Sequence, residues 1–192
     1  MKKTILGITG SSASGKSTVT RLLTTEKNAQ QVITATSRQP RLNEKDQVDY
    51  HFLTDADFIE HPENFIEVNQ RYDYYYGTPW HSLEETLAQT DLATIVLDQR
   101  GVAFFRNHFK NHPTINFYSL YLETDNLKNQ FMRMVARGDS TTTINQRIKT
   151  AKNENEYEIP EQTDLVLNVF EETDWQEKLL NFLSEITTRD QK

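Results

Sequence analysis

The residues that most constrain the fold are 10–17, Gly-Ser-Ser-Ala-Ser-Gly-Lys-Ser, which fit the phosphate-loop pattern G-x-x-x-x-G-K-[ST]. The apolar run Thr4–Thr9 before them predicts a short buried strand, and Lys16–Leu23 after them predicts a helix. Glycines in this context let the backbone wrap closely around phosphate oxygens, and the loop N–H groups and helix N-terminus offer partial positive charge. The alternative, a Gly/Ser-rich turn that fits by chance, does not explain the strand and helix on either side. The loop therefore predicts a site for a nucleoside triphosphate.

Two side chains of the loop have the chemistry to act on that triphosphate. Lys16 can bridge its β- and γ-phosphates, and the Ser17 hydroxyl can ligate Mg²⁺. ATP and Mg²⁺ are accordingly the expected ligands. The predicted ATP-binding residues here are the loop and its next neighbour, Gly10, Ser11, Ser12, Ala13, Ser14, Gly15, Lys16, Ser17 and Thr18. The loop does not identify the molecule that receives the phosphoryl group.

Apolar runs and helical patterns alternate along the rest of the chain. Further strands are expected at Gln31–Ala35, Ala93–Leu97, Ile115–Leu122 and Asp164–Val169, and helices at Leu83–Ala88, Leu127–Val135 and Ile144–Lys152. A C-terminal helix is expected with Thr173 or Asp174 as its cap, Glu177 closing a capping box, and an apolar stripe of Trp175, Leu179, Leu180, Leu183 and Ile186. Strands that alternate with helices predict a parallel sheet covered on both faces.

Two stretches break this alternation. Residues Thr36–Thr78 are rich in Arg, Asp, Tyr and Asn, which indicates an insertion. The polar stretch Arg137–Thr143 predicts a mobile loop between two helices. The length of 192 residues suits one compact domain with small mobile parts.

Composition excludes several classes of function. The formal net charge is −7 at pH 7, which disfavours binding to nucleic acid but leaves room for a small anionic ligand beside local arginines. The chain has no cysteine, so disulfides and thiolate catalysis are excluded, and a cytoplasmic location is expected. It has no run of about 18 apolar residues, so no membrane span is expected.

A pair of arginines follows the second expected strand. Arg38 and Arg41 flank Pro40 and can grip one phosphate from two sides, because a planar guanidinium matches phosphate geometry. Tyr50 can add a neutral donor. A solvated charged loop is the alternative that these residues alone leave open.

Six spaced motifs carry a family resemblance together with the phosphate loop. They are Thr36-Ser37-Arg38-Gln39-Pro40-Arg41, Asp49-Tyr50-His51-Phe52, Phe65-Ile66-Glu67, Tyr75-Tyr76-Gly77-Thr78, Asp98–Gly101, and Arg133–Gly138 with Arg147 after it. In this order, over nearly the whole chain, they closely resemble the guanylate kinases. The resemblance implies an enzyme that transfers a phosphoryl group from ATP to GMP.

The resemblance also implies a role for individual residues. The implied GMP-binding residues are Arg38, Arg41, Tyr50 and Tyr76 at the phosphate, Glu67 at guanine N1–H and N2, Thr34 and Thr78 at the base edge, and Asp98 at the acceptor site or at Mg²⁺-bound water. Arg137 and Arg147 would close over the transferring group beside Lys16, and Asn168 would lie near the ATP adenine. An ordinary surface carboxylate is the alternative for Glu67.

The fold implied is a three-layer α/β P-loop kinase with a parallel core sheet, an acceptor-binding insert and a short lid. The expected core comprises about residues 1–35, 79–136 and 148–192, the GMP-binding insert about 36–78, and the lid about 137–147. The expected partners are the two small nucleotides, and the expected assembly is a monomer or homodimer.

Several positions depart from the family pattern. Asp73-Tyr74 replaces the usual Gly-Asn, so the loop over GMP is expected to differ in shape. Arg100 replaces the usual Gln and can pair with Asp98. Tyr121-Leu122-Glu123 replaces the usual Pro-Pro-Ser, and the lid is one residue shorter and poorer in acidic residues.

Two other functions remain open beside GMP phosphorylation. A different phosphorylated acceptor, such as a sugar phosphate, would not need a guanine reader at Glu67. A non-catalytic interaction module would typically lack the phosphate loop that this chain keeps. His108 and His112 are four residues apart and can share the face of a helix that ends at Pro113, but a metal site there is disfavoured because no third ligand is near in sequence. The cluster Tyr72–Tyr76 is expected to serve packing and acceptor contacts.

Overall fold

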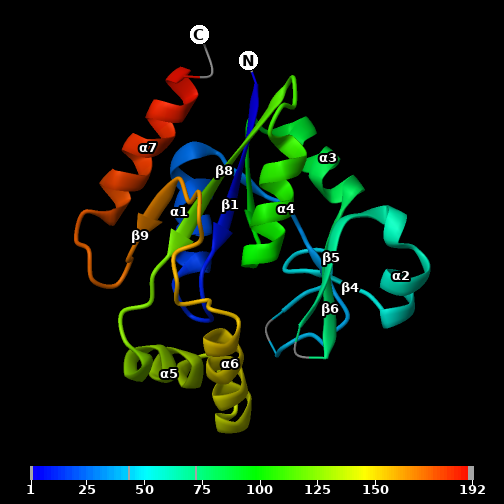
Figure 1. Cartoon of the computed structure of the whole chain (residues 1–192), viewed down its shortest axis with the longest axis vertical. Coiled ribbons are helices and arrows are strands. Elements are labelled where there is room, and N and C mark those ends of the chain that lie inside the picture. The colour runs from blue at the N-terminus through cyan, green and yellow to red at the C-terminus, as the bar shows by residue number, and fades with distance from the viewer. Residues whose placement is uncertain (1, 43, 72, 190–192) are drawn as a thin grey trace.

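The computed structural model describes residues 2–42, 44–71 and 73–189. A five-stranded parallel sheet forms the centre, in the order β2-β7-β1-β8-β9 (Figure 1). Its strands are β1 (Lys3–Thr9), β2 (Gln30–Gln31), β7 (Leu92–Val96), β8 (Ile115–Leu122) and β9 (Leu165–Leu167). The middle strand β1 is almost wholly buried, as expected for a parallel sheet that is covered on both faces.

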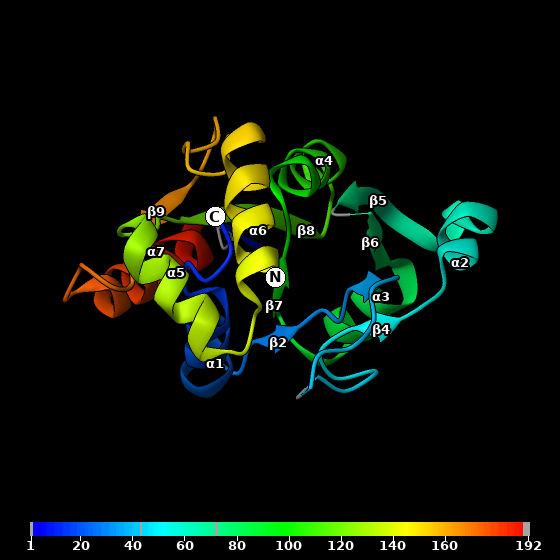
Figure 2. The ribbon, with the colours of Figure 1, turned by 90° about the horizontal axis from the view of Figure 1, so that it is seen from below.

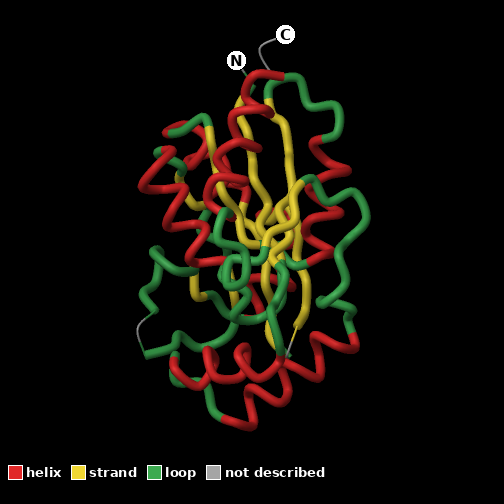
Figure 3. Tube along the Cα trace, turned by 90° about the vertical axis from the view of Figure 1, so that its left-hand side faces the viewer, coloured by secondary structure: helices red, strands yellow, loops and turns green. Residues whose placement is uncertain are grey.

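Helices pack on both faces of this sheet, which is visible edge-on in Figure 3. One face carries α1 (Lys16–Lys27) and α7 (Trp175–Arg189), and the other carries α3 (Trp80–Gln89) and α4 (Gln99–Phe109). Each face has its own apolar cluster, with Val19, Leu23, Leu179 and Leu183 on the first and Leu83, Leu87, Val102 and Phe105 on the second. The predicted three-layer α/β fold is confirmed.

A second sheet lies beside the core. It has the order β4-β3-β6-β5 and comprises β3 (Ala35–Thr36), β4 (His51–Phe52), β5 (Phe65–Arg71) and β6 (Tyr74–Pro79), with α2 (Asp55–Glu60) and a 3₁₀ turn at Pro62–Asn64 against it. Ala35, Phe58 and Phe65 form a small apolar cluster of their own. The stretch that interrupts the core pattern therefore folds around its own core.

The helices α5 (Leu127–Ala136) and α6 (Thr141–Asn153) lie across the carboxyl ends of the core strands, as seen from below in Figure 2. Ser140 caps α6 by accepting a hydrogen bond from the Thr143 N–H. In the described part of the chain, no helix is both long enough and apolar enough to span a membrane.

Local structure differs from the sequence prediction at three places. The strand expected at Gln31–Ala35 is divided, because the chain leaves the core sheet after β2 and enters the second sheet at β3. The loop expected through Thr143 is shorter, since α6 already begins at Thr141. The helix expected to run on to Pro113 ends at Phe109, so His108 lies on it and His112 does not, and His108 packs against Trp80 and Phe104. Tyr72 of the predicted tyrosine cluster lies outside the described residues.

Candidate active site

A cleft of about 890 Å³ opens at the carboxyl ends of the core strands. Its walls come from the phosphate loop, from the second sheet and from α6 with the connection before it. Lys16 lies on one wall, and Arg38, Arg41 and Glu67 lie on another. Residues that the sequence places more than twenty positions apart thus meet in one cavity.

The loop between β1 and α1 needs glycine at two positions. Gly10 has φ +140°, and a Cβ there would lie 2.5 Å from the Leu122 carbonyl oxygen. Gly15 has φ +103°, and a Cβ there would lie 2.3 Å from Val169 Cγ2. Residues that carry a side chain rarely adopt such φ values, so both positions require glycine for the loop to turn back onto the helix N-terminus.

Lys16 begins α1 and points back into this loop. Its Nζ donates to the carbonyl oxygens of Gly10 at 2.6 Å and Ser11 at 2.8 Å. Burial, and then the charges of Arg71, Arg137 and Arg147, lower the pKa of Lys16 to about 7. A polyphosphate placed here would add negative charge beside this group of cations and favour the charged form of Lys16.

The loop is fixed from outside by α5. Buried Gln130 donates to Ser11 Oγ at 3.0 Å and to the Ser12 carbonyl at 2.7 Å, and it accepts from the Tyr157 hydroxyl at 2.9 Å. Arg133 donates to the Ala13 carbonyl at 3.0 Å. The shape of the loop therefore depends on contacts with a helix more than 100 residues away in sequence.

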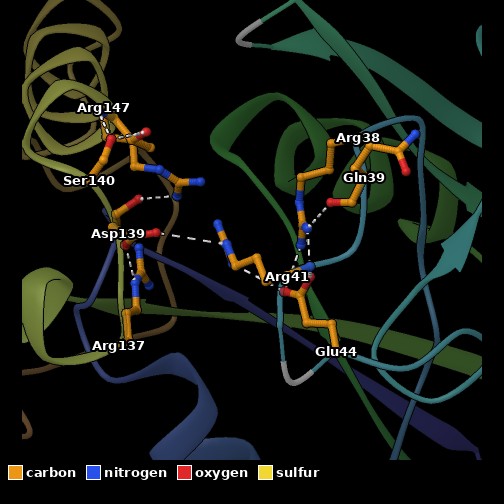
Figure 4. A network of polar contacts seen from close by, with 10 residues as sticks. Arg38, Gln39, Arg41, Glu44, Arg137, Asp139, Ser140 and Arg147 are labelled. Atoms are coloured by element: carbon orange, nitrogen blue, oxygen red, sulfur yellow. Dashed lines mark hydrogen bonds and ion pairs between the residues drawn. The ribbon is translucent and has the colours of Figure 1, made fainter.

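Arg38 and Arg41 surround a carboxylate (Figure 4). Arg38 holds Glu44 with two hydrogen bonds of 2.6 and 2.7 Å, and Arg41 adds its backbone N–H at 2.9 Å and its guanidinium at 3.1 Å. Burial of Glu44 opposes ionisation, but these hydrogen bonds and charges lower its pKa. The Tyr50 ring lies 4.9 Å from the Arg38 guanidinium carbon. The two guanidinium groups also line the cleft, where an anionic ligand can bind them.

Glu67 lies on β5 and is held from both sides. Its two carboxylate oxygens accept from Thr78 Oγ1 and from Asn69 Nδ2, each at 2.8 Å. Burial, with the nearby Asp98 charge, outweighs these hydrogen bonds and raises the pKa of Glu67 to about 7. A buried carboxylate with fixed orientation is suited to accept from a planar ligand that offers adjacent N–H groups.

One carboxylate connects the second sheet with the segment before α6. Asp139 contacts Arg137 and lies 3.8 Å from Arg41 Nε (Figure 4). Its side chain is only 6% exposed. Arg147, on α6, donates to Ser12 Oγ at 3.3 Å. Arg137 and Arg147 both line the cleft near the phosphate loop.

The remaining predicted site residues are placed differently from one another. Thr34, Tyr76 and Asp98 line the cleft, and Thr78 is buried behind Glu67. Asp98 caps α4 by accepting from the Gly101 N–H at 2.7 Å. Asn168 is buried and accepts from the Phe170 N–H at 3.2 Å, which orders the turn after β9, and Phe170 itself reaches the cleft.

The donor set fits Mg²⁺ bound chiefly through a substrate. The Ser17 hydroxyl lies at the cleft, whereas no cluster of three His, Cys, Asp or Glu side chains suited to a metal occurs in the described part of the chain. Magnesium typically keeps several waters and is held by one or two protein groups together with phosphate oxygens. Ser17 would be the protein ligand.

Several residues of the site escaped sequence reasoning. Asn69 lies two positions after Glu67 on one strand, so both side chains face the same side, and this spacing was a usable signal. Gln130 and Asp139 gave no such signal, because their partners come from distant segments. Among the described residues, Arg100 and Asp98 do not form the ion pair that the sequence predicted. Asp98 caps α4 instead.

A phosphate loop after the central strand of a parallel sheet, with helices on both faces, defines a P-loop nucleotide-binding protein. The chain belongs to the guanylate kinase family, since the model of that family matches residues 1–185. A guanylate kinase of Fusobacterium nucleatum is 33% identical over 154 residues, which cover 79% of this chain and 80% of the relative. A guanylate kinase of Aster yellows witches'-broom phytoplasma is 34% identical over 158 residues, covering 80% and 73%.

A solved structure agrees on the fold. The crystal structure of guanylate kinase from Anaplasma phagocytophilum matches with a TM-score of 0.62, covering 99% of this chain and 86% of that one. The two sequences are 19% identical, so this likeness speaks for the fold alone. The predicted family and its class of enzyme, nucleoside monophosphate kinase, are confirmed by the family model and the two relatives.

Proposed function

We propose that this protein transfers the γ-phosphoryl group of ATP to GMP and releases ADP and GDP. A GMP phosphate oxygen attacks the γ-phosphorus, and the bond from that phosphorus to the ADP oxygen breaks. The observation that carries the proposal is the single cleft in which Lys16 faces Arg38, Arg41 and Glu67. Such an arrangement supplies a triphosphate site and a second anion site with a base reader beside it.

The donor end of the cleft would hold ATP. The loop N–H groups and Lys16 would bind its phosphates, and Ser17 would ligate the Mg²⁺, which neutralises phosphate charge when bound. Arg137 and Arg147 would approach the transferring group from the lid side. Phosphoryl transfer depends mainly on positioning and on charge stabilisation, and these residues offer both.

The acceptor end would hold GMP. Arg38, Arg41, Tyr50 and Tyr76 would bind its phosphate, which would replace the Glu44 carboxylate as a partner of the two arginines. Glu67 would accept from guanine N1–H and N2–H. Adenine offers no such pair of donors and would leave the remaining acceptor sites of the buried carboxylate unfilled, a penalty on the order of 10⁴-fold in discrimination. Thr34, Thr78 and Asp98 would complete the site.

The other readings gain less support. A phosphosugar has no planar base to fill the remaining acceptor sites of the buried Glu67, which Asn69 and Thr78 hold in a fixed orientation. A binding module would not require Lys16, Arg137 and Arg147 to converge on one cleft. The division into core, insert and lid, the adenine contact of Asn168, the cytoplasmic location, and the monomer or homodimer stay predictions from the sequence.

The proposal is tested by measuring ADP release with GMP, dGMP, AMP, CMP, UMP and a panel of sugar phosphates. GMP-dependent release that is lost in Lys16→Ala and removed by chelating Mg²⁺ is the expected result. Lys27→Ala is the matched control, because it removes an exposed lysine from the other end of the same helix. Turnover with a sugar phosphate alone, or tight GMP binding without turnover, would contradict the proposal.

A further inference from the structure

Arg71 ends strand β5 and lines the same cleft as Lys16, Arg137 and Arg147. It belongs to none of the motifs that carry the family resemblance. Burial is the largest cause of the lowered pKa of Lys16, and the charge of Arg71 is the second largest, before the charges of Arg137 and Arg147. A cation supplied by the second sheet therefore lies at the phosphate end of the cleft.

Arg71 is anchored by two carboxylates that follow α6. It forms an ion pair with Glu156, and its Nε lies 3.6 Å from Glu154 Oε2. The side chains of Arg71 and Glu156 are 20% and 9% exposed. The pair joins the second sheet to the core at the edge of the cleft.

The segment that carries Glu156 is itself fixed. The hydroxyl of buried Tyr121 donates to the Glu156 carbonyl at 2.8 Å, and the Glu156 N–H donates to the Ala151 carbonyl at 2.8 Å. Gln99 adds a hydrogen bond of 3.1 Å to the Asn155 carbonyl. Tyr121 is one of the three residues at which this chain departs from the family's Pro-Pro-Ser. The hydroxyl group that this departure introduces helps to hold Glu156 in place.

We propose that Arg71 is a further catalytic residue, which binds a phosphate oxygen at the transfer site when both nucleotides are present, and that Glu156 positions it. This rests on the proposed function above. Arg71 neither gives nor takes a proton, since its guanidinium stays charged throughout. Its role is to offset the negative charge that two nucleotides bring together between Lys16 and the lid arginines.

A purely structural ion pair would behave differently. Burying two charges costs desolvation energy, and replacing such a pair is often neutral for stability, so stability alone gives little reason for it. The location of the pair in the cleft, beside three other cations, gives it a functional reason. A charge that acts in the transition state should affect kcat more than the ground-state affinity for either nucleotide.

The test compares Arg71→Gln, Arg71→Lys and Glu156→Gln. We expect Arg71→Gln to lower kcat at least about tenfold, as the loss of one transition-state donor does elsewhere, while the dissociation constants of GMP and of a non-hydrolysable ATP analogue change less than about threefold. Arg71→Lys should restore part of kcat, and Glu156→Gln should lower it less than Arg71→Gln. Arg106→Gln is the matched control, because Arg106 is similarly buried and paired with Asp164 but does not line the cleft.

Two outcomes would overturn the proposal. One is a kcat of Arg71→Gln within twofold of the wild type, and the other is an equal loss in Arg106→Gln. Where Arg71→Gln does not fold, the double variant with Glu156→Gln removes both charges and is judged by the same kcat criterion. A wild-type protein that fails to phosphorylate GMP would instead contradict the proposed function, so the two failures are distinguishable.

Discussion

Burial gives Glu67 a pKa of about 7, well above the ordinary value of 4.5 for a glutamate. Guanine recognition needs the ionised form, because a protonated carboxyl group loses one acceptor site. The folded state, in contrast, binds the proton more tightly than the unfolded chain does. Glu67 therefore stabilises the unliganded protein below pH 4.5, and this contribution is lost as the pH rises through about 7.

We expect kcat/KM for GMP to rise about tenfold between pH 6 and pH 8 when it is measured at saturating ATP, whose bound phosphates keep Lys16 charged over this range. Over this range the ionised fraction of a group with a pKa of about 7 grows by roughly that factor. Glu67→Gln should be much less active, and its kcat/KM should show only the pH dependence that arises from titration of the nucleotide phosphates. The same tenfold rise in Glu67→Gln would assign the titration to another group.

At the scale of single residues, the site residues that the sequence predicted stand in local motifs, whereas those that it missed depend on contacts between distant segments. Lys16, Arg38 and Glu67 were predicted as site residues because each stands in a short motif, Lys16 in the phosphate loop and the other two in motifs that carry the family resemblance, and all three line the cleft. Asp139 was not, since its value comes from lying between Arg137 and Arg41, which the chain brings together only in three dimensions.

At the scale of elements, the phosphate loop depends on α5 as much as on its own glycines. Gln130 is 1% exposed and contributes two donor contacts to the loop. Gln130→Leu leaves the Ser12 carbonyl without this partner and frees the loop to move. We expect KM for ATP to rise about tenfold while KM for GMP changes less than about twofold, because a lost hydrogen bond of this kind costs roughly 1–3 kcal/mol.

Tyr157→Phe provides a graded comparison for that prediction. It removes only the hydroxyl that orients Gln130, so it should shift KM for ATP in the same direction by a smaller factor. Steady-state kinetics with each nucleotide varied in turn measures both variants. An equal rise in both KM values would mean that Gln130 supports the whole cleft rather than the loop.

Elements with strong local signals were predictable, and those defined by tertiary pairing were not. β1 and α1 follow from an apolar run and a helical face on either side of a glycine-rich loop. The break between β2 and β3 has no such signal, since the apolar run continues through Val32, whose N–H still donates to the Thr94 carbonyl of β7, and the chain turns toward the second sheet only after it. The threonines that begin α6 are weak helix formers, so their sequence indicated a loop where Ser140 in fact caps a helix.

At the scale of the whole molecule, the cleft has walls from three parts, and ion pairs cross between these parts. Asp139 contacts Arg137 in the connection before α6 and approaches Arg41 in the loop between β3 and β4, while Glu156 pairs with Arg71 across another edge. The alternation of strands and helices predicted the core, and the polar composition of 36–78 predicted an insertion. The small apolar core of that insertion was not predictable, because Ala35, Phe58 and Phe65 come together only through its mixed sheet.

This arrangement predicts that the two nucleotides bind cooperatively. The first nucleotide orders the walls that the second also needs, so the second pays less of the ordering entropy. We expect GMP to tighten the binding of a non-hydrolysable ATP analogue at least about fivefold, and the analogue to tighten GMP by the same factor, as linkage requires. Calorimetric titration of each ligand with and without the other measures both. Asp139→Asn should reduce the coupling, because it weakens the contact between the walls. Equal affinities in the presence and absence of the first nucleotide would show that the walls are already ordered before either ligand binds.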